Sequence, residues 1–102
     1  MLLPWWRVEV RGLSMVPTLG PGDWLLVRRN VTPRPGAVVV VRQGGRLAIK
    51  RAIRVDDEGV WVEGDNAAAS DDSRTYGPVA PQDVLGEARW RYNPMGLLRR
   101  VR

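Results

Sequence analysis

Short runs of apolar residues, separated by Gly, Pro and Asp, recur along the whole chain. Runs with the length and composition of β-strands cover residues 7–11, 24–28, 37–42, 46–54, 60–63 and 84–92. The run at 37–42 is almost continuous Val, which predicts a strand that is buried on both faces. Short strands between turn residues are typical of a small barrel or sandwich rather than a helical bundle. We therefore predict an all-β domain built from short antiparallel strands and hairpins.

Two turn signals connect three of these strands. Gly44-Gly45 separates 37–42 from 46–54, and the polar segment 56–59 separates 46–54 from 60–63. Short polar or Gly-rich connections of this kind favour hairpins, so the three strands are expected to form a meander. Successive side chains of a strand point to opposite faces, which puts Lys50 on the same face as Ala48 and Ala52. Lys50 is thus expected between two small apolar side chains.

Two segments do not fit this strand pattern. Residues 65–78 form a polar, turn-rich stretch that is too long for a hairpin loop, and loops of this kind often carry function. The segment 93–102 is rich in Arg with little periodicity, and we expect it to be frayed or bound to the surface. These features predict one domain over residues 1–102, with a core at about 7–92 and a basic tail at 93–102.

Composition narrows the class of protein. A chain of 102 residues has the size of one domain, and 16 Lys and Arg against 11 Asp and Glu give a net charge of +5. The longest apolar stretches, such as residues 37–41, are far shorter than the ~18 residues that span a bilayer. Pro4 interrupts the apolar N-terminal segment. We therefore expect no transmembrane segment and a location in the cytoplasm or at the periphery of a membrane.

The chain contains no His and no Cys. This excludes a Ser-His-Asp triad, a cysteine nucleophile, disulfides and the usual structural zinc sites, so we predict no metal site and no cofactor. Lys50 is the only lysine, and the other 15 of the 16 basic residues are Arg. Because Arg stays protonated in proteins, Lys50 is the only basic side chain that can act as a base. The alternative is a compositional bias toward Arg that leaves one Lys without a role.

Ser and Lys together offer the remaining route to a strong nucleophile, because a neutral Lys amine can accept the proton of a Ser hydroxyl. The chain has three serines, Ser14, Ser70 and Ser73. Ser14 lies between a predicted strand and a Pro-containing turn, where backbone N–H groups can stabilise an oxyanion. Ser70 and Ser73 lie in the long polar loop.

Four segments resemble, in order, the motif series of the type I signal peptidases, which are serine peptidases with a Ser/Lys dyad. They are Gly12-Leu13-Ser14-Met15-Val16-Pro17-Thr18-Leu19 with Gly22-Asp23, Lys50-Arg51-Ala52-Ile53, Gly64-Asp65-Asn66, and Ser70-Asp71-Asp72-Ser73-Arg74. The resemblance spans residues 12–79 and is more specific than any single motif. It implies the β-barrel or β-ribbon fold that signal peptidases share with repressor peptidases.

The resemblance also implies roles for individual residues. Ser14 would be the nucleophile, Lys50 the general base, and Ser70 the hydroxyl that orients the Lys50 amine, while Asp72 and Arg74 would form a structural ion pair beneath the site. Burial beside Ala48 and Ala52 would lower the pKa of Lys50, in agreement with a role as base. For Asp72 and Arg74, a plain surface pair that contributes at most ~1 kcal/mol is the alternative.

The chain also departs from the family pattern. Gly12 stands where many members carry a Ser that assists the oxyanion, so the oxyanion hole would depend on backbone N–H groups, chiefly that of Ser14, in the turn that contains Gly12 and Met15. The usual Gly-Pro-Gly-Asp continuation after the Lys motif is missing. The chain thus resembles a minimal version of the family core.

Short chains without an anchor that carry a Gly-Asp-Asn-Ala-Ala-Ala-Ser motif and an Arg-Tyr-Asn-Pro segment, here residues 64–70 and 91–94, resemble the nickel-type superoxide dismutase maturation proteases. This resemblance implies a protein substrate from which a short propeptide is removed, and no metal in the protease itself. The family prefers small residues such as Ala before the scissile bond. We expect the substrate to add as an extended strand beside residues 8–11 and 38–42. The residues expected to bind it are Val8, Val10, Val38, Val40, Ala48 and Ala52.

Other functions remain open at this level. The chain could be a membrane-associated signal peptidase core, or a self-cleaving repressor-type Ser/Lys peptidase, although only 13 residues precede Ser14. It could also be a non-catalytic basic β-barrel module whose Trp and Arg residues bind single-stranded nucleic acid. Against that module, Trp24 and Trp61 lie within predicted strands and are expected in the core, so we expect no nucleic-acid partner. Trp5 and Trp6 could form a patch that contacts a membrane surface or substrate, or a packing cap.

Overall fold

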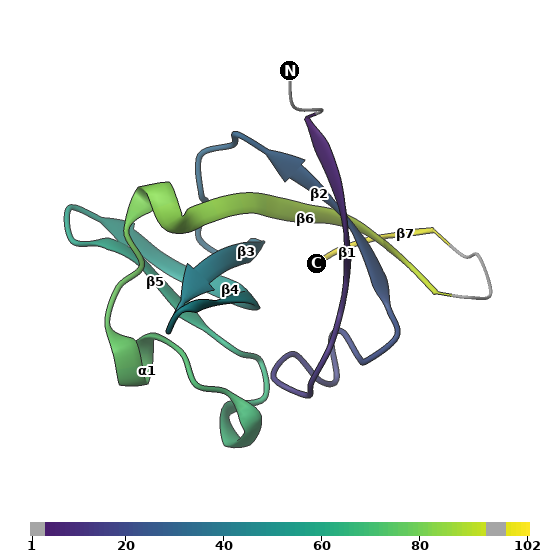
Figure 1. The fold of residues 1–102 in the computed structure, drawn as a ribbon, viewed down its shortest axis with the longest axis horizontal. Coiled ribbons are helices and arrows are strands. Elements are labelled where there is room, and N and C mark those ends of the chain that lie inside the picture. Colours follow the sequence, from purple (N-terminus) through teal and green to yellow (C-terminus); the bar gives the residue numbers. More distant parts are fainter. Residues whose placement is uncertain (1–3, 94–97) are drawn as a thin grey trace.

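The computed structural model describes residues 4–93 and 98–102, and nearly all of its regular structure is β-sheet (Figure 1). The strands are β1 (Trp5–Glu9), β2 (Trp24–Arg29), β3 (Val38–Gln43), β4 (Arg46–Asp56), β5 (Gly59–Glu63), β6 (Val84–Tyr92) and β7 (Arg99–Arg100). The helical turns are η1 (Ala67–Ala69), α1 (Ser73–Tyr76) and η2 (Pro81–Asp83). The prediction of an all-β domain is confirmed, and the observed strand ends differ from the predicted ones by two residues or fewer.

The strands pair antiparallel in the order β1-β2-β6-β3-β4-β5, and β7 adds to β6. The meander β3-β4-β5 is the one that the two turns predict. β6 pairs with β2 on one side and β3 on the other, so it connects the two halves of the sheet (Figure 1). Register shifts between Leu26 and Val27 and between Val40 and Val41 lie at these junctions. Such bulges increase the local twist of the strands and curve the sheet around its core.

The core consists of two clusters of buried side chains on opposite faces of β3. The first contains Val10, Met15, Leu19, Leu25, Val27, Val38, Val40 and Ala88. The second contains Val39, Val41, Ala52, Val60, Val62 and Val79. Because alternate residues of a strand point to opposite faces, Val38 and Val40 enter one cluster and Val39 and Val41 the other. The predicted burial of this strand on both faces is confirmed.

Part of the basic tail adds to the fold. Arg99 pairs with Arg91 and Arg100 with Trp90, and Val101 packs against the first core cluster. Of the two expectations for this tail, frayed or bound to the surface, residues 99–101 match the second, because β6 offers them an edge to pair with. Residues 1–3 and 94–97, which include Pro94 of the Arg-Tyr-Asn-Pro segment, lie outside the described residues.

The expectation that Trp24 and Trp61 lie in the core was wrong. Both are half-buried, and each ring stacks against an Arg guanidinium at 5.0 Å, Trp24 against Arg7 and Trp61 against Arg54. On β2, Leu25 and Val27 point into the first core cluster, so the adjacent Trp24 points outward. Within residues 4–93 and 98–102, no helix is long and apolar enough to cross a membrane.

Candidate active site

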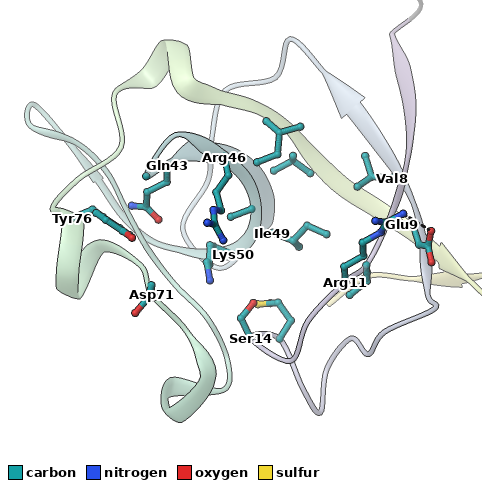
Figure 2. Close-up of a pocket in the computed structure, with 16 residues that line it drawn as sticks. Val8, Glu9, Arg11, Ser14, Gln43, Arg46, Ile49, Lys50, Asp71 and Tyr76 are labelled. Carbon is teal, nitrogen blue, oxygen red and sulfur yellow. Dashed lines mark ion pairs between the residues drawn. The ribbon is translucent and has the colours of Figure 1, made fainter.

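A cleft of about 550 Å³ separates the end of β1 and the loop after it from the β3–β4 hairpin. Ser14 and Lys50, which are 36 residues apart in the sequence, both line this cleft. Figure 2 shows the Lys50 amine directed from β4 toward Ser14 on the opposite wall. The fold thus brings together the two side chains that the sequence predicts as a dyad.

The loop that carries Ser14 is held from both sides. Met15 and Leu19 are buried in the first core cluster, 2% and 1% exposed, and fix the loop to the sheet. The Ser14 carbonyl accepts a hydrogen bond of 2.8 Å from the Asn66 N–H. Gly12 begins the turn with φ of +76°, a left-handed conformation that favours Gly. Ser14 is therefore presented by a loop with a fixed backbone.

Ser14 itself keeps its reactive groups available. In the part of the chain that the structure describes, neither the Ser14 hydroxyl nor its backbone N–H makes a hydrogen bond. A nucleophile needs a free oxygen, and an oxyanion hole needs an N–H that is not already occupied. Both requirements are met at Ser14.

Lys50 is buried on β4 and is only 4% exposed. Its Nζ donates a hydrogen bond of 2.8 Å to Ser70 Oγ. Burial lowers the pKa of Lys50; the negative charges of Asp72 and Asp71 oppose this shift, and the positive charge of Arg74 adds to it. The net effect lowers the pKa of Lys50, which increases the fraction of neutral amine near neutral pH.

Ser70 couples Lys50 to a buried carboxylate. Its hydroxyl donates to Asp72 Oδ2 at 2.6 Å. A hydroxyl has one proton, so Ser70 Oγ can only accept from Lys50. A neutral Lys50 therefore uses an N–H toward Ser70 and keeps its lone pair for another partner. Ser70 thus joins Lys50 to Asp72 through two hydrogen bonds.

Asp72 is fully buried and precedes α1 as its N-cap. It accepts hydrogen bonds from Arg74 Nη2 at 2.6 Å and Arg74 Nε at 2.9 Å, and from the Gly64 N–H at 2.8 Å. Burial raises the pKa of Asp72, but the hydrogen bonds from Arg74, Ser70 and Gly64 outweigh burial and hold the pKa well below its usual range. The carboxylate stays ionised, and its burial distinguishes the pair with Arg74 from a plain surface ion pair.

Ser73 lies outside this chain of hydrogen bonds. It is 1% exposed, and its Oγ accepts from the Val62 N–H at 2.9 Å. This contact fixes the start of α1 to β5. Of the three serines, only Ser14 lines the cleft, and only Ser70 is hydrogen-bonded to Lys50.

Sequence reasoning assigned no role to Gly64, although its motif was noted. A Cβ at this position would lie 2.3 Å from Ser70 Oγ and 2.6 Å from the Ser14 carbonyl oxygen. Both distances are much shorter than van der Waals contact, so the site requires the absence of a side chain here. A Gly next to Asp in a loop is common, and the sequence alone gives no sign of this close approach.

The sequence also gave no indication that Asp65 connects the loop of Ser14 to the strand of Lys50 by hydrogen bonds. Arg51, next to Lys50, donates to both oxygens of Asp65, at 2.7 and 3.2 Å, and Thr18 Oγ1 donates to Asp65 Oδ2 at 2.6 Å. The hydrogen bonds from Arg51 lower the pKa of Asp65; burial opposes this shift, and Thr18 reinforces it. Asp65 thus connects the loop of Ser14 to the strand of Lys50. No local pattern could have identified partners this far apart in the sequence.

The residues expected to bind substrate fall into two groups. Val8, Val10, Val40 and Ala48 line the cleft. Val38 and Ala52 are 2% and 0% exposed and lie in the first and second core clusters. The strand 38–42 cannot offer its edge, because β3 pairs with β4 on one side and β6 on the other. The open edge belongs instead to β4, where pairing with β5 begins only at Arg51.

The cleft provides no obvious set of metal ligands. Among the residues that the structure describes, no three His, Cys, Asp or Glu side chains come together to hold a metal ion.

Comparison with known proteins identifies the family. A sequence profile described as Peptidase S24-like matches residues 6–80, which include Ser14, Lys50 and Ser70. The chain belongs to the Peptidase S24-like family. It is 34% identical over 119 aligned positions to the mitochondrial ATP-independent inner membrane protease subunit 1a of Arabidopsis thaliana, covering 84% of this chain and 69% of that protein.

Subunit 1b of the same Arabidopsis thaliana protease is 30% identical over 113 aligned positions, covering 81% of this chain and 67% of that protein. No solved structure gives a significant match. The family match and the similarity to two protease subunits support one class for this Peptidase S24-like chain. That class is a signal-peptidase-type serine protease, which acts on a protein substrate.

Proposed function

We propose that the protein is a serine endopeptidase in which Ser14 and Lys50 form a catalytic dyad that removes an N-terminal signal or propeptide from a precursor protein. The observation that carries this proposal is the buried Lys50 amine, which lines the cleft with Ser14 and is oriented by Ser70. Lys50 is the only lysine of the chain, and its pKa is lowered by burial.

Acylation begins when Ser14 Oγ attacks the carbonyl carbon of the scissile peptide bond. Lys50 Nζ accepts the Ser14 proton as the new C–O bond forms, which gives a tetrahedral intermediate and a protonated Lys50. Collapse of the intermediate breaks the C–N bond, and Lys50 returns the proton to the leaving amine. In deacylation, neutral Lys50 accepts a proton from water as the water oxygen attacks the ester carbonyl carbon. The C–O bond to Ser14 then breaks, Lys50 returns the proton to Ser14 Oγ, and the acid product leaves.

Several groups would support these steps. The Ser14 N–H is available to the negative oxygen of the intermediate, and Gly12 adds no hydroxyl to it. While Lys50 carries the extra proton, the ionised Asp72 stabilises the positive charge through Ser70. Ser70 and Asp72 act through Lys50 and are positioning residues.

The substrate would bind as an extended strand between the end of β1 and the open edge of β4. Both segments line the cleft, and added strands gain main-chain hydrogen bonds from such an edge. The resemblance to nickel-type superoxide dismutase maturation proteases makes a propeptide junction of that kind the first substrate to test. The alternative is a membrane-associated signal peptidase core. That alternative is favoured by the similarity to subunits whose name places them in the inner membrane.

Mass spectrometry of cleavage products tests the proposal. A precursor peptide spanning the propeptide junction of a nickel superoxide dismutase is incubated with wild type, Ser14→Ala and Lys50→Ala at neutral and alkaline pH. Thr32→Ala removes an exposed hydroxyl outside the cleft and serves as the control. Site-specific cleavage by wild type and Thr32→Ala alone supports the dyad and the maturation role.

Two other outcomes are informative. Cleavage of an Ala-x-Ala signal-type peptide, but not of the dismutase junction, would retain the peptidase and reject the substrate. Equal activity of Ser14→Ala and wild type on any cleaved peptide would refute the dyad.

A further inference from the structure

The cleft continues from the dyad along β4 and has two walls of different chemistry. Residues 46–50 of β4 form its open edge, because β5 pairs with β4 only from Arg51 onward. On the face of the first core cluster, the lining is apolar and includes Val8, Val10, Met15, Val40 and Ile49. On the opposite face, the lining is polar and includes Gln43, Arg46, Asp71 and Tyr76. We call the second set the polar wall.

Gln43 is the unusual residue of the polar wall. It is only 9% exposed, and among the described residues neither its Nε2 nor its Oε1 has a hydrogen-bond partner. Buried amides in native proteins nearly always have partners, because leaving them unsatisfied is costly. Gln43 also lines the cleft. Its amide is therefore placed to be completed by a molecule that enters the cleft.

Arg46 lies directly opposite Gln43 in the β3–β4 pair, so the two side chains share one face. Arg46 is exposed and, within the described parts of the chain, has no carboxylate partner. Figure 2 shows Gln43 and Arg46 on the same side of the cleft as Lys50. Tyr76 packs over Gly44 at the far end, where its ring lies 3.0 Å from the position of an added Cβ.

We propose that the polar wall is a specificity subsite for an acidic side chain of the substrate, bound by the Arg46 guanidinium and the Gln43 amide nitrogen. This inference rests on the proposed peptidase function and adds a second specificity element to it. Among the described residues no ion pair involves Arg46, and Glu9, an acid that lines the cleft, pairs with Arg11 at 3.6 Å. A carboxylate would pair with Arg46 and accept from Gln43 Nε2, which supplies the missing partner of that nitrogen.

The geometry also sets the position of the acidic residue. Lys50, beside the scissile bond, and Arg46 are four residues apart on β4, which is ~13 Å at the usual rise of a strand. A substrate strand along this edge advances by the same rise, so the acidic side chain would lie about four residues from the scissile bond. Because side chains alternate, its two neighbours would face the apolar wall.

A peptide series tests the subsite. Peptides that carry Glu, Gln, Lys or Ala at each position two to five residues from the cleaved bond, on either side, are compared by kcat/KM with wild type, Arg46→Glu and Gln43→Met. Wild type is expected to prefer Glu over Lys about 10-fold at one position near the fourth. Arg46→Glu should reverse this preference, and Gln43→Met should reduce it. Arg54→Glu, a charge reversal on the same strand outside the cleft, should keep it.

A binding measurement separates this proposal from the catalytic one. The affinity of Ser14→Ala for fluorescein-labelled Glu and Lys peptides is measured by fluorescence polarisation with and without Arg46→Glu, so that no cleavage is required. A Glu preference that Arg46→Glu reverses supports the subsite even where the dyad fails. Equal affinities for Glu and Lys peptides, or a preference that Arg46→Glu does not change, would overturn the subsite while leaving the dyad intact.

Discussion

Replacing Gly64 by Ala would displace Ser70 without removing its hydroxyl group, and therefore tests whether the position of that hydroxyl matters. The added Cβ would lie 2.3 Å from Ser70 Oγ, 2.6 Å from Ser70 Cβ and 2.6 Å from the Ser14 carbonyl oxygen. Ordinary contact for these atoms begins at ~3.4 Å, so Ser70 and the Ser14 loop must both move away from the new Cβ by about 1 Å. Displacement of this size breaks the 2.8 Å hydrogen bond between Lys50 and Ser70.

The expected result is a loss of about 100-fold in kcat/KM, because a misplacement of ~1 Å in a catalytic array has effects of this order. The assay is cleavage of the best peptide substrate, with the folded fraction of each variant measured by circular dichroism. Gly86→Ala is the control for crowding, since its Cβ would meet Val27 at 2.6 Å and the Arg28 carbonyl at 2.7 Å, away from the cleft. Gly20→Ala is the control without crowding, since nothing lies within 4 Å of its Cβ.

Per folded molecule, both controls should keep the activity of wild type, while Gly64→Ala loses it. If Gly64→Ala retains wild-type kcat/KM, or if Gly86→Ala loses as much activity as Gly64→Ala at equal folded fraction, the reasoning from this close approach is refuted.

Three further predictions follow from the charges around the site. Asp71→Asn removes a negative charge that raises the pKa of Lys50, so the rising limb of the kcat/KM profile should shift to lower pH; the exposed, remote Asp57→Asn should not shift it. Asp72→Asn should cost at least ~2 kcal/mol at pH 7, because buried hydrogen bonds to a charged group are lost. Because the pKa of Asp72 is depressed in the folded state, the extra stability of wild type is present above about pH 4 and is lost as the pH falls below this value. If urea titrations show that the difference in unfolding free energy between wild type and Asp72→Asn does not shrink in acid, the depressed pKa of Asp72 is contradicted. Lys50→Met should be more stable than wild type near pH 7 and should lose this advantage toward pH 10, because the unfolded chain binds the Lys50 proton more tightly than the folded chain. If the advantage of Lys50→Met in denaturation midpoint instead grows with pH, burial does not destabilise the charged Lys50.

The architecture followed from the sequence because its signals are local. The Gly44-Gly45 turn and the alternation around Lys50 set the β3–β4 hairpin and the face on which Lys50 lies. The Val run of β3 could only be buried on both sides. Trp24 was misassigned because alternation fixes which residues share a face but not which face is inside, and on β2 the inner face carries Leu25 and Val27.

The site was only partly accessible to such reasoning. The dyad candidates followed from what the chain lacks, since without His and Cys a base can only be Lys50. The contacts that position the dyad join residues distant in sequence, such as Arg51 and Thr18 through Asp65, and depend on how the loops pack. The sequence did not reveal that β3, beside which the substrate was expected, is paired on both sides while β4 keeps an open edge. The point at which β5 stops pairing depends on a register that no single strand reveals.

Because Lys50 is the one lysine of the sequence, reagents that modify lysine side chains can label this protein at a single, known position. Apart from the α-amino group of the chain, Lys50 carries the one primary amine of the whole sequence, and it lies in the cleft. Reductive methylation with isotopically labelled formaldehyde would therefore place one side-chain probe in the cleft, and the resonance of that probe would follow the protonation of the Lys50 amine directly. For the same reason, amine-directed crosslinkers and immobilisation chemistries would find no other lysine at which to attach, and trypsin would cut this chain almost only after arginines.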